Sequence, residues 1–331
     1  MKRERLALYG IVLLLFGLGM YSFGVVVAIP RRLFFDTQWM RSVNEWLVWY
    51  SGFPVMIGGF LVLIDLFFLY PQKRKNDFIQ HDNVNVHALT VALTAYNDEA
   101  SIGLAVRDFL DHPSVKRVIV VSNNSTDQTI ALAEAAGAIV HNELLQGYGA
   151  CVHRALSEAV KYSDTELVVL CEGDMTFRAY DIDKMAAYIP HADIVTGTRT
   201  VEQLRAKDTQ LSTFMFYGNL FVGKLLEIKH LGNATFSDVG TTYKILRSNR
   251  VAEILSDLDP RVNLEFNPYF LDTSLARGLR VIEVPITFHK RVGLSKGGNI
   301  DNFVALRLGI KMIKGIAFGW GTRPIDSVPK G

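Results

Sequence analysis

Cysteine is scarce in this chain, which disfavours several kinds of protein. Only Cys151 and Cys171 occur among the 331 residues, and both lie in apolar stretches. Their separation is not the spacing of a metal site, and a disulfide is not expected in a reducing compartment. We therefore expect both to be small core residues. The formal net charge is only +2, which gives no indication of a nucleic-acid partner.

Charged residues are missing altogether from residues 7–29. This run is long enough to cross the hydrocarbon core of a membrane as a helix. A second stretch, residues 48–70, is equally apolar apart from Asp65. A signal peptide is the competing interpretation of the first run, but the run is too long, lacks a small-residue cleavage site and precedes a second span. We predict two transmembrane helices within residues 1–71.

The positions of lysine and arginine near these two spans indicate their orientation. Basic residues precede the first span and follow the second, namely Lys2, Arg3, Arg5, Lys73, Arg74 and Lys75. Because cytoplasmic segments carry the excess of basic residues, both termini and the rest of the chain are predicted to be cytoplasmic. Residues 30–47 then form a short external loop. Asp65 lies near the cytoplasmic end of its helix, where it can snorkel or pair with a cation.

Beyond a polar linker at residues 72–87, strand-like and helix-like segments alternate without internal repeats. Strands are predicted at residues 88–94, 115–121, 138–141, 166–171, 193–196 and 280–284, and helices at residues 101–111, 126–136, 149–162, 212–227 and 268–276. Alternation of this kind indicates βαβ units with right-handed crossovers. We therefore predict one α/β domain over residues 88–298 with a mostly parallel sheet.

The C-terminal segment, residues 299–331, contains an amphipathic pattern. Apolar residues recur at helical spacing over residues 303–320, while Arg307, Lys311 and Lys314 fall on the other side. A basic amphipathic helix of this kind can lie in a membrane interface. The alternative is a helix that packs on its own domain, and the membrane spans elsewhere in the chain favour the interface.

The strand at residues 166–171 runs directly into two carboxylates, Glu172 and Asp174. Its apolar character is typical of a central strand covered on both faces, and ligands of open α/β sheets bind at the carboxyl ends of such strands. Two oxygen ligands at this spacing suit Mg²⁺ or Mn²⁺ carrying a diphosphate. The alternative is a strand that simply ends in a solvated turn.

Three further polar loops are predicted at the same edge of the sheet. Residues 94–99 follow the first strand, residues 122–129 follow the second, and residues 146–150 open the long helix. An aromatic ring, amides and carboxylates gathered there can stack against and hydrogen-bond a nucleoside. The amino terminus of the helix favours anions, and its glycines allow a close approach of the backbone. Four such loops in order favour a nucleotide site.

These four loops resemble those of the family 2 glycosyltransferases with the GT-A fold, over about residues 88–296. Within that family the chain is similar to the dolichyl-phosphate mannose synthase group of polyprenyl-phosphate hexosyltransferases. The segments 197–199, 238–244 and 291–296 carry the closer resemblance. Glu172 stands where the family usually has Asp, and Asn123 stands where it usually has an acid. The membrane helices of related enzymes are commonly C-terminal, whereas here they are N-terminal.

The resemblance implies a role for each matching residue. It implies catalytic roles for Asp174, Asp238 and Arg199, and a metal site formed by Glu172, Asp174 and Thr176. It implies acceptor contacts by Arg199, Thr241 and Lys244. It implies nucleotide-sugar contacts by Ala95, Tyr96, Asn97, Glu99, Asn123, Ser125, Asp127, Gly147, Gly149, Glu172, Gly173, Arg291 and Lys296.

The expected reaction is inverting transfer of a hexose from a UDP- or GDP-sugar to a polyprenyl phosphate at the cytoplasmic face, with Mg²⁺ or Mn²⁺. A lipid phosphate is already an anion near neutral pH and requires little general-base help. A lipid hydroxyl, the alternative acceptor, would require a base, for which Asp238 or Glu265 are the candidates. A catalytically silent GT-A domain that serves as a membrane scaffold is a further alternative.

Overall fold

The computed structural model describes residues 6–33, 37–69, 79–230, 233–293 and 302–321. The chain divides into two compact units, one of which is built almost entirely from residues before position 78, and the other from the residues that follow. The predicted linker, residues 72–87, lies partly outside the described residues. Lys296 lies outside them as well.

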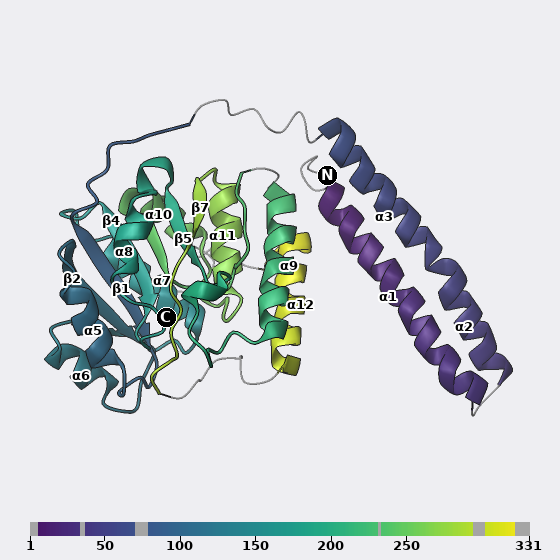
Figure 1. Ribbon diagram of the computed structural model, residues 1–331, viewed down its shortest axis with the longest axis horizontal. Coiled ribbons are helices and arrows are strands. Elements are labelled where there is room, and N and C mark those ends of the chain that lie inside the picture. The colour runs from purple at the N-terminus through teal and green to yellow at the C-terminus, as the bar shows by residue number, and fades with distance from the viewer. Residues whose placement is uncertain (1–5, 34–36, 70–78, 231–232, 294–301, 322–331) are drawn as a thin grey trace, which may run out of the picture. The chain divides into compact units, whose positions relative to one another are not determined.

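The first unit is a helical hairpin. Helix α1 (Leu6–Leu33) packs against α2 (Gln38–Tyr50) and α3 (Gly52–Ile64), which are followed by one π-helical turn at Asp65–Leu69 (Figure 1). Two helical stretches, Leu6–Leu33 and Gln38–Phe68, are long and apolar enough to cross a membrane. Most of the predicted external loop, residues 30–47, is therefore helical, since the stretches Leu6–Leu33 and Gln38–Phe68 are both longer than the apolar runs that predicted them.

Glycines bring the two arms of the hairpin together. Gly10, Gly17 and Gly24 recur every seven residues along one side of α1. A Cβ atom at Gly17 would lie 2.8 Å from the Ser51 carbonyl oxygen, so the backbones approach as closely as glycine alone permits. Asp65 is buried and accepts a hydrogen bond from the Ala7 backbone N–H at 3.0 Å. It therefore satisfies one of the orphan donors of the first turn of α1.

The second unit contains a seven-stranded sheet with helices on both faces (Figure 1). The strand order is β3-β2-β1-β4-β6-β5-β7. The strands are β1 (Leu89–Ala95), β2 (Val115–Ser122), β3 (Ile139–Asn142), β4 (Leu167–Glu172), β5 (Ile194–Thr198), β6 (Lys244–Arg247) and β7 (Val281–Pro285). The helices are α5 (Ile102–Leu110), α6 (Thr129–Ala135), α7 (Tyr148–Ala159), α8 (Asp181–Ala186), α9 (Thr213–His230), α10 (Ser248–Ile254), α11 (Phe266–Ala276) and α12 (Asn302–Phe318). The predicted α/β architecture is confirmed.

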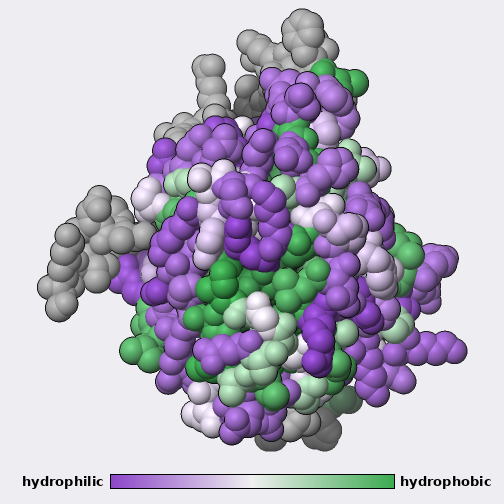
Figure 2. All heavy atoms as spheres, turned by 90° about the vertical axis from the view of Figure 1, so that its left-hand side faces the viewer, coloured by the Kyte–Doolittle hydropathy of each residue, from purple (hydrophilic) through white to green (hydrophobic). Residues whose placement is uncertain are grey.

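The central strands are buried on both faces, as their apolar composition predicts. Every residue of β1 is buried. Its odd-numbered residues, such as Val91 and Leu93, pack in one core with α5 and α8, while α7 crosses β1, β2 and β4 on the other face. On the side of this unit where α5, α6 and β2 lie, Figure 2 shows an apolar area surrounded by polar surface. Some apolar exposure is usual for folded proteins.

One strand departs from the parallel pattern. Strand β6 runs antiparallel to both β4 and β5, with Lys244 beside Leu170 and Thr196. The chain re-enters the sheet at the edge where the parallel strands end, so β6 must run backward. Four residues are too few to show a period, and the sequence did not predict β6, α8 or α10. The amino end of β6 therefore meets the carboxyl ends of its neighbours.

Helix α12 packs on the second unit by one face. Met312, Ile316 and Ala317 are buried, and the Trp320 indole N–H donates to Asp272 Oδ2 of α11 at 2.6 Å. Phe303 and Ile310 remain exposed on the same helix. The amphipathic helix thus has a buried face on its own domain and an exposed apolar surface besides.

Replacing Gly17 by leucine should force the hairpin arms apart, because the new side chain would collide with the Ser51 carbonyl and Val55. We expect a loss of about 2 kcal/mol, typical of overpacking, measured by denaturation of the detergent-solubilised protein. Gly19→Leu is the matched control, since a Cβ atom at Gly19 meets nothing within 4 Å. Equal losses in the two variants would contradict close packing at Gly17.

Candidate functional site

A cavity of about 450 Å³ opens at the edge where the parallel strands end. It is a size typical of small-molecule sites and lies at the position where α/β sheets bind ligands. The predicted site residues that line it are Ala95, Tyr96, Asn123, Gly147, Glu172, Thr176, Arg199 and Arg291.

Glu172 is the last residue of β4 and reaches the cavity. Its Oε1 atom accepts a hydrogen bond from the Thr242 hydroxyl at 2.7 Å. Burial raises the pKa of Glu172 to about 7, and the nearby charge of Asp174 acts in the same direction. The carboxylate therefore sits in an environment that lacks enough positive charge to compensate it.

Asp174 is almost fully buried behind this wall. Its Oδ1 atom accepts hydrogen bonds from the Thr176 backbone N–H at 3.0 Å and from the Thr176 hydroxyl at 2.5 Å. Its Oδ2 atom accepts no hydrogen bond from the described part of the chain. A buried carboxylate oxygen that accepts no hydrogen bond among the described residues and has only an ion pair with Arg291 fits a hard cation such as Mg²⁺ or Mn²⁺. Thr176 acts here by orienting Asp174.

The guanidinium of Arg291 bridges two carboxylates beside the cavity. It lies 2.9 Å from Asp98 Oδ1 and 3.3 Å from Asp174 Oδ2. The backbone on either side is fixed, because the His289 N–H donates to the Thr176 carbonyl and the Val292 N–H donates to the Asp174 carbonyl. In this state the protein supplies its own positive charge to the acidic pocket.

Among the described residues, no group of three or more His, Cys, Asp or Glu side chains is arranged to hold a metal ion. Two carboxylates are nevertheless enough for a cation that also binds substrate phosphates. The predicted pair, Glu172 and Asp174, is brought together as the sequence indicates.

Several predicted nucleotide contacts instead hold two loops to each other. The Asn97 N–H donates to the Ser125 hydroxyl, and Asn97 Oδ1 accepts from the Thr126 N–H at 2.8 Å. Glu99 accepts from the Gln128 N–H, and its own N–H donates to Asp127. Asn97, Glu99, Ser125 and Asp127 do not line the cavity. They shape the loops that carry Tyr96 and Asn123 to it.

Asn123 reaches the cavity but its amide is already engaged. Its Oδ1 atom accepts from the Gly147 N–H at 2.8 Å and from the Gln146 amide, and its Nδ2 atom donates to the Glu143 and Leu145 carbonyls. The side chain therefore fastens the glycine loop to the end of β2.

The glycines at the site serve the protein's own packing as much as a ligand. Gly147 has a φ of +145°, which side chains rarely adopt. A Cβ atom at Gly149 would lie 1.6 Å from the Val262 carbonyl oxygen, and one at Gly173 would lie 2.4 Å from Ile102 Cδ1. Gly149 is thus required where it meets the backbone of Val262, whereas at Gly173 the atom met is the end of a side chain that can shift.

Arg199 and Asp238 form a buried, bidentate ion pair on the other side of the cavity. Arg199 Nε lies 2.7 Å from Asp238 Oδ2, and Nη2 lies 2.8 Å from Oδ1. Burial acts to raise the pKa of Asp238, but the charge of Arg199 and its hydrogen bonds hold that pKa below its usual range. Arg199 lines the cavity, whereas Asp238 lies behind it.

Thr241 and Lys244, both predicted to touch the acceptor, lie behind the cavity wall. The Thr241 hydroxyl donates to Asp238 Oδ2 at 2.7 Å. The Lys244 ammonium donates to the Thr241 and Thr242 carbonyls and to Asn267 Oδ1. Burial lowers the pKa of Lys244 from 10.5 to about 7. Glu265, the alternative base, does not line the cavity either.

Several cavity residues escaped the sequence analysis. Asp98 lies within residues 94–99, the first of the polar loops predicted at the site, so the sequence pattern alone is enough to find it. Tyr148 lies between two glycines, and its hydroxyl meets Thr242 and Asn267. Residues from later in the chain carry no motif and reach the cavity only through folding, namely Gln210, Met215, Asn219, Asn263, Leu264, Asn267, Phe288, Leu308 and Met312.

The sequence of this chain is similar to those of known glycosyltransferases. Residues 90–249 match the family described as Glycosyl transferase family 2. A protein of Shigella flexneri called RfbJ is 32% identical over 113 residues, which are 34% of this chain and 84% of that protein. A dolichyl-phosphate hexose transferase of Haloferax volcanii is 27% identical over 209 residues, which are 63% of this chain and 86% of that protein.

Three mycobacterial glycosyltransferases of unassigned function are 36% identical to this chain over 113 residues. These residues are 34% of this chain and 49% of each relative. The chain therefore matches about half the length of these relatives. Among solved structures, glucosyl-3-phosphoglycerate synthase from Mycobacterium tuberculosis superposes with a TM-score of 0.51 at 16% identity, covering 70% of this chain and 78% of that one. This likeness confirms the predicted GT-A fold.

Replacing Arg291 by glutamine should destabilise the metal-free protein, because Asp98 and Asp174 lose their shared cation. We expect a loss on the order of 2–3 kcal/mol in EDTA and a larger recovery on adding Mn²⁺ than the wild type shows. Thermal unfolding measures both. Arg178→Gln, which breaks an ion pair with Asp108 away from the cavity, should lose stability without this recovery. Equal responses to Mn²⁺ would contradict the bridging role.

Replacing Lys244 by methionine should change how stability depends on pH. Between pH 7 and about 10 the unfolded chain binds a proton at Lys244 that the folded chain does not, so this lysine makes wild-type stability rise with pH. The variant should lack that rise. Chemical denaturation at pH 7 and pH 9.5 measures it, with the exposed Lys161→Met as control. An unchanged slope in Lys244→Met would contradict the lowered pKa.

Proposed function

Because this chain belongs to glycosyl transferase family 2, we propose that it transfers a hexose from a nucleotide-diphosphate sugar to a polyprenyl phosphate at the cytoplasmic face of a membrane. The transfer inverts the anomeric centre, since a single displacement by the acceptor is sufficient. The observation that carries the proposal is a cavity with two charged ends, one acidic and one basic. Glu172 and Asp174 define the first and Arg199 the second.

The acidic end suits the donor. Glu172 and Asp174 would hold Mg²⁺ or Mn²⁺, and Thr176 would keep Asp174 in place. The metal, when bound, neutralises negative charge on the departing diphosphate. Arg291 is attached to a fixed backbone beside the same carboxylates, so a side-chain movement is enough to bring its guanidinium to the diphosphate. The synthase with the same fold was solved with Mn²⁺ and uridine-diphosphate, which supports this assignment.

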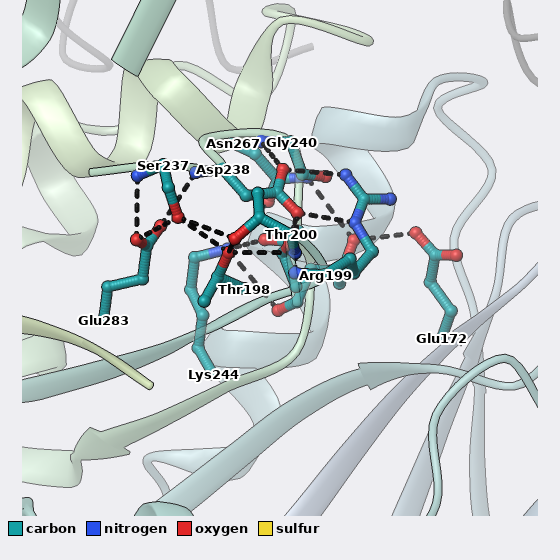
Figure 3. A network of polar contacts seen from close by, with 12 residues as sticks. Glu172, Thr198, Arg199, Thr200, Ser237, Asp238, Gly240, Lys244, Asn267 and Glu283 are labelled. Atoms are coloured by element: carbon teal, nitrogen blue, oxygen red, sulfur yellow. Dashed lines mark hydrogen bonds and ion pairs between the residues drawn. The ribbon is translucent and has the colours of Figure 1, made fainter. Parts of the chain in front are cut away.

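The basic end suits an acceptor with a phosphate and an apolar chain. Arg199 presents its guanidinium at the cavity wall, and Figure 3 shows it between Asp238 and Glu172. Guanidinium groups bind phosphate oxygens through paired hydrogen bonds. The wall nearby is apolar, formed by Met215 of α9, Phe288, and Met312 of α12. The name of the Haloferax relative points to the same kind of acceptor.

The environments of Asp238 and Glu265, the two candidate bases, favour a phosphate over a hydroxyl acceptor. Asp238 is about 1% exposed, and its carboxylate already accepts hydrogen bonds from Arg199, Thr241 and the Gly240 N–H. Its lowered pKa makes it a weak proton acceptor. Glu265 does not reach the cavity. A phosphate oxygen, already anionic near neutral pH, attacks without giving up a proton.

The surface near the cavity suits work at a bilayer. Helices α9 and α12 expose apolar side chains, namely Phe214, Tyr217, Phe221, Phe303, Val304, Leu306, Ile310 and Phe318. Arg307, Lys311 and Lys314 of α12 are exposed as well. Apolar and basic groups together bind interfaces that contain anionic lipids. The hairpin of α1 and α3 would anchor the enzyme in the same membrane.

Membranes that contain the enzyme, incubated with radiolabelled UDP- and GDP-hexoses, should accumulate a labelled lipid that mild acid cleaves. A sugar linked through phosphate at its anomeric carbon is labile under these conditions, whereas a glycoside of a lipid hydroxyl is stable. Asp174→Ala should lower the transfer at least 100-fold, because it removes the buried oxygen that fits the metal.

Each other outcome decides against a part of the proposal. An acid-stable labelled lipid would replace the phosphate acceptor with a hydroxyl. If no labelled lipid formed with any donor, the catalytically silent membrane scaffold would be the alternative that stands. Full activity of Asp174→Ala would overturn the metal assignment.

A further inference from the structure

A buried loop, Ser237–Tyr243, connects the two charged ends of the cavity. It joins the segment after α9 to β6 and contains no helix or strand. Asp238, Thr241 and Thr242 within it are nearly inaccessible to solvent. Its backbone N–H and C=O groups therefore need partners inside the protein. Several of those partners belong to two ionisable side chains that the proposed function does not use.

Glu283 of β7 holds the beginning of the loop. Its carboxylate accepts hydrogen bonds from the Ser237 N–H at 2.8 Å, the Ser237 hydroxyl at 2.6 Å and the Asp238 N–H at 2.8 Å. Glu283 does not line the cavity. Three donors converge on one carboxylate, which fixes the backbone from which the Asp238 side chain leaves.

Lys244, the first residue of β6, holds the end of the loop. Its ammonium donates to the carbonyls of Thr241 and Thr242 and to Asn267 Oδ1, the last at 3.0 Å. Asn267 Nδ2 donates to the Gly240 carbonyl at 3.1 Å. A buried carboxyl group thus binds the N–H groups at one end of the loop, and a buried amine binds the C=O groups at the other (Figure 3).

The loop supplies one side chain to each end of the cavity. Asp238 binds the Arg199 guanidinium through two of its nitrogens and also accepts from the Arg199 backbone N–H at 3.2 Å. Thr242 donates to Glu172 at 2.7 Å. A displacement of this loop would therefore move the phosphate-binding arginine and the metal-side carboxylate together.

We infer that Glu283 and Lys244 are positioning residues for the transfer reaction, which fix Arg199 and Glu172 through the loop Ser237–Tyr243. The inference rests on the proposed function, in which Arg199 binds the acceptor phosphate. Neither residue touches the cavity, so both act through another side chain. Lys244, which the sequence assigned to the acceptor, acts from behind the wall.

These two side chains are suited to this task because each one binds several groups of the loop at once. The low local polarity strengthens each of these hydrogen bonds. In Glu283→Gln an amide N–H₂ group would replace one carboxylate oxygen, and this donor would face the backbone N–H that the oxygen had accepted. The start of the loop would then lose at least one of its three hydrogen bonds. Arg199 would be held less accurately, and small displacements weaken transfer disproportionately.

A double-mutant cycle of Glu283→Gln and Arg199→Gln tests the inference on the full-length enzyme in membranes. The acceptor is a short-chain polyprenyl phosphate, and the readouts are the KM for this acceptor and the affinity for the nucleoside diphosphate with Mn²⁺. Glu283→Gln should raise the acceptor KM about tenfold while diphosphate affinity stays within about twofold. In the Arg199→Gln background it should have no further effect on acceptor KM.

Two controls separate positioning from general destabilisation. Asp193→Asn removes a buried carboxylate that accepts the Arg280 N–H at the opposite edge of the sheet, and should lower Tm without changing the acceptor KM. Lys244→Met removes the amine at the other end of the loop. It should reduce kcat in both the wild-type and the Arg199→Gln backgrounds, because it also acts on Glu172.

The outcomes distinguish this inference from the proposed function. If Arg199→Gln leaves the acceptor KM unchanged, the proposed role of Arg199 fails and the inference falls with it. If Arg199→Gln raises that KM but Glu283→Gln does not, or if the two effects multiply, the proposed function stands and the role of Glu283 is overturned. A Lys244→Met variant with unchanged kcat overturns the role of Lys244.

Discussion

The charges at this site are largely buried, and the protein must compensate each of them internally. Arg199 is matched by Asp238, and Arg291 is shared between Asp98 and Asp174. Burial of unpaired charge is costly, so these partners fix side chains that a solvated site would leave free. Glu172 is the member with too little compensation, as its raised pKa indicates. Internal ion pairs therefore order most of the site, and Glu172 is where a cation would add compensating charge.

This constraint explains why the topology matters. Parallel strands bring loops of very different sequence position to one edge, and the antiparallel β6 adds a loop that enters from the same side. Lys244 can donate to the carbonyls of Thr241 and Thr242 because β6 begins where its neighbouring strands end. Glu283 on β7 reaches the same loop from the outer strand of the sheet. Charges at one edge are thus connected through the backbone that lies between them.

The sequence predicted much of this arrangement. The apolar strand before Glu172, the polar loops and the alternation of elements gave the sheet and the edge at which the site lies. It also predicted the pairing of Glu172 with Asp174 and the presence of Arg199 and Arg291. It did not separate residues that line the cavity from residues that support them. Asn97 and Glu99 belong to the same loop as Tyr96, and Asp127 belongs to the same loop as Asn123, but their side chains bind neighbouring loops.

Local pattern determined the apolar spans, the strands other than β6 and the acidic loop after β4, because these depend on neighbours in the chain, and the family resemblance added Arg199 and Arg291. The tertiary structure alone decided that Asp238 neutralises Arg199, that Lys244 lies behind the wall, and that Glu283 and Asn267 hold the loop between them. The physical reason is distance along the chain. Glu283 lies 45 residues from Asp238, and Asn267 lies 27 residues from Gly240, the backbone partners that they bind in this loop. No local sequence pattern predicts either contact. Such hydrogen bonds exist only once the sheet has brought its edges together.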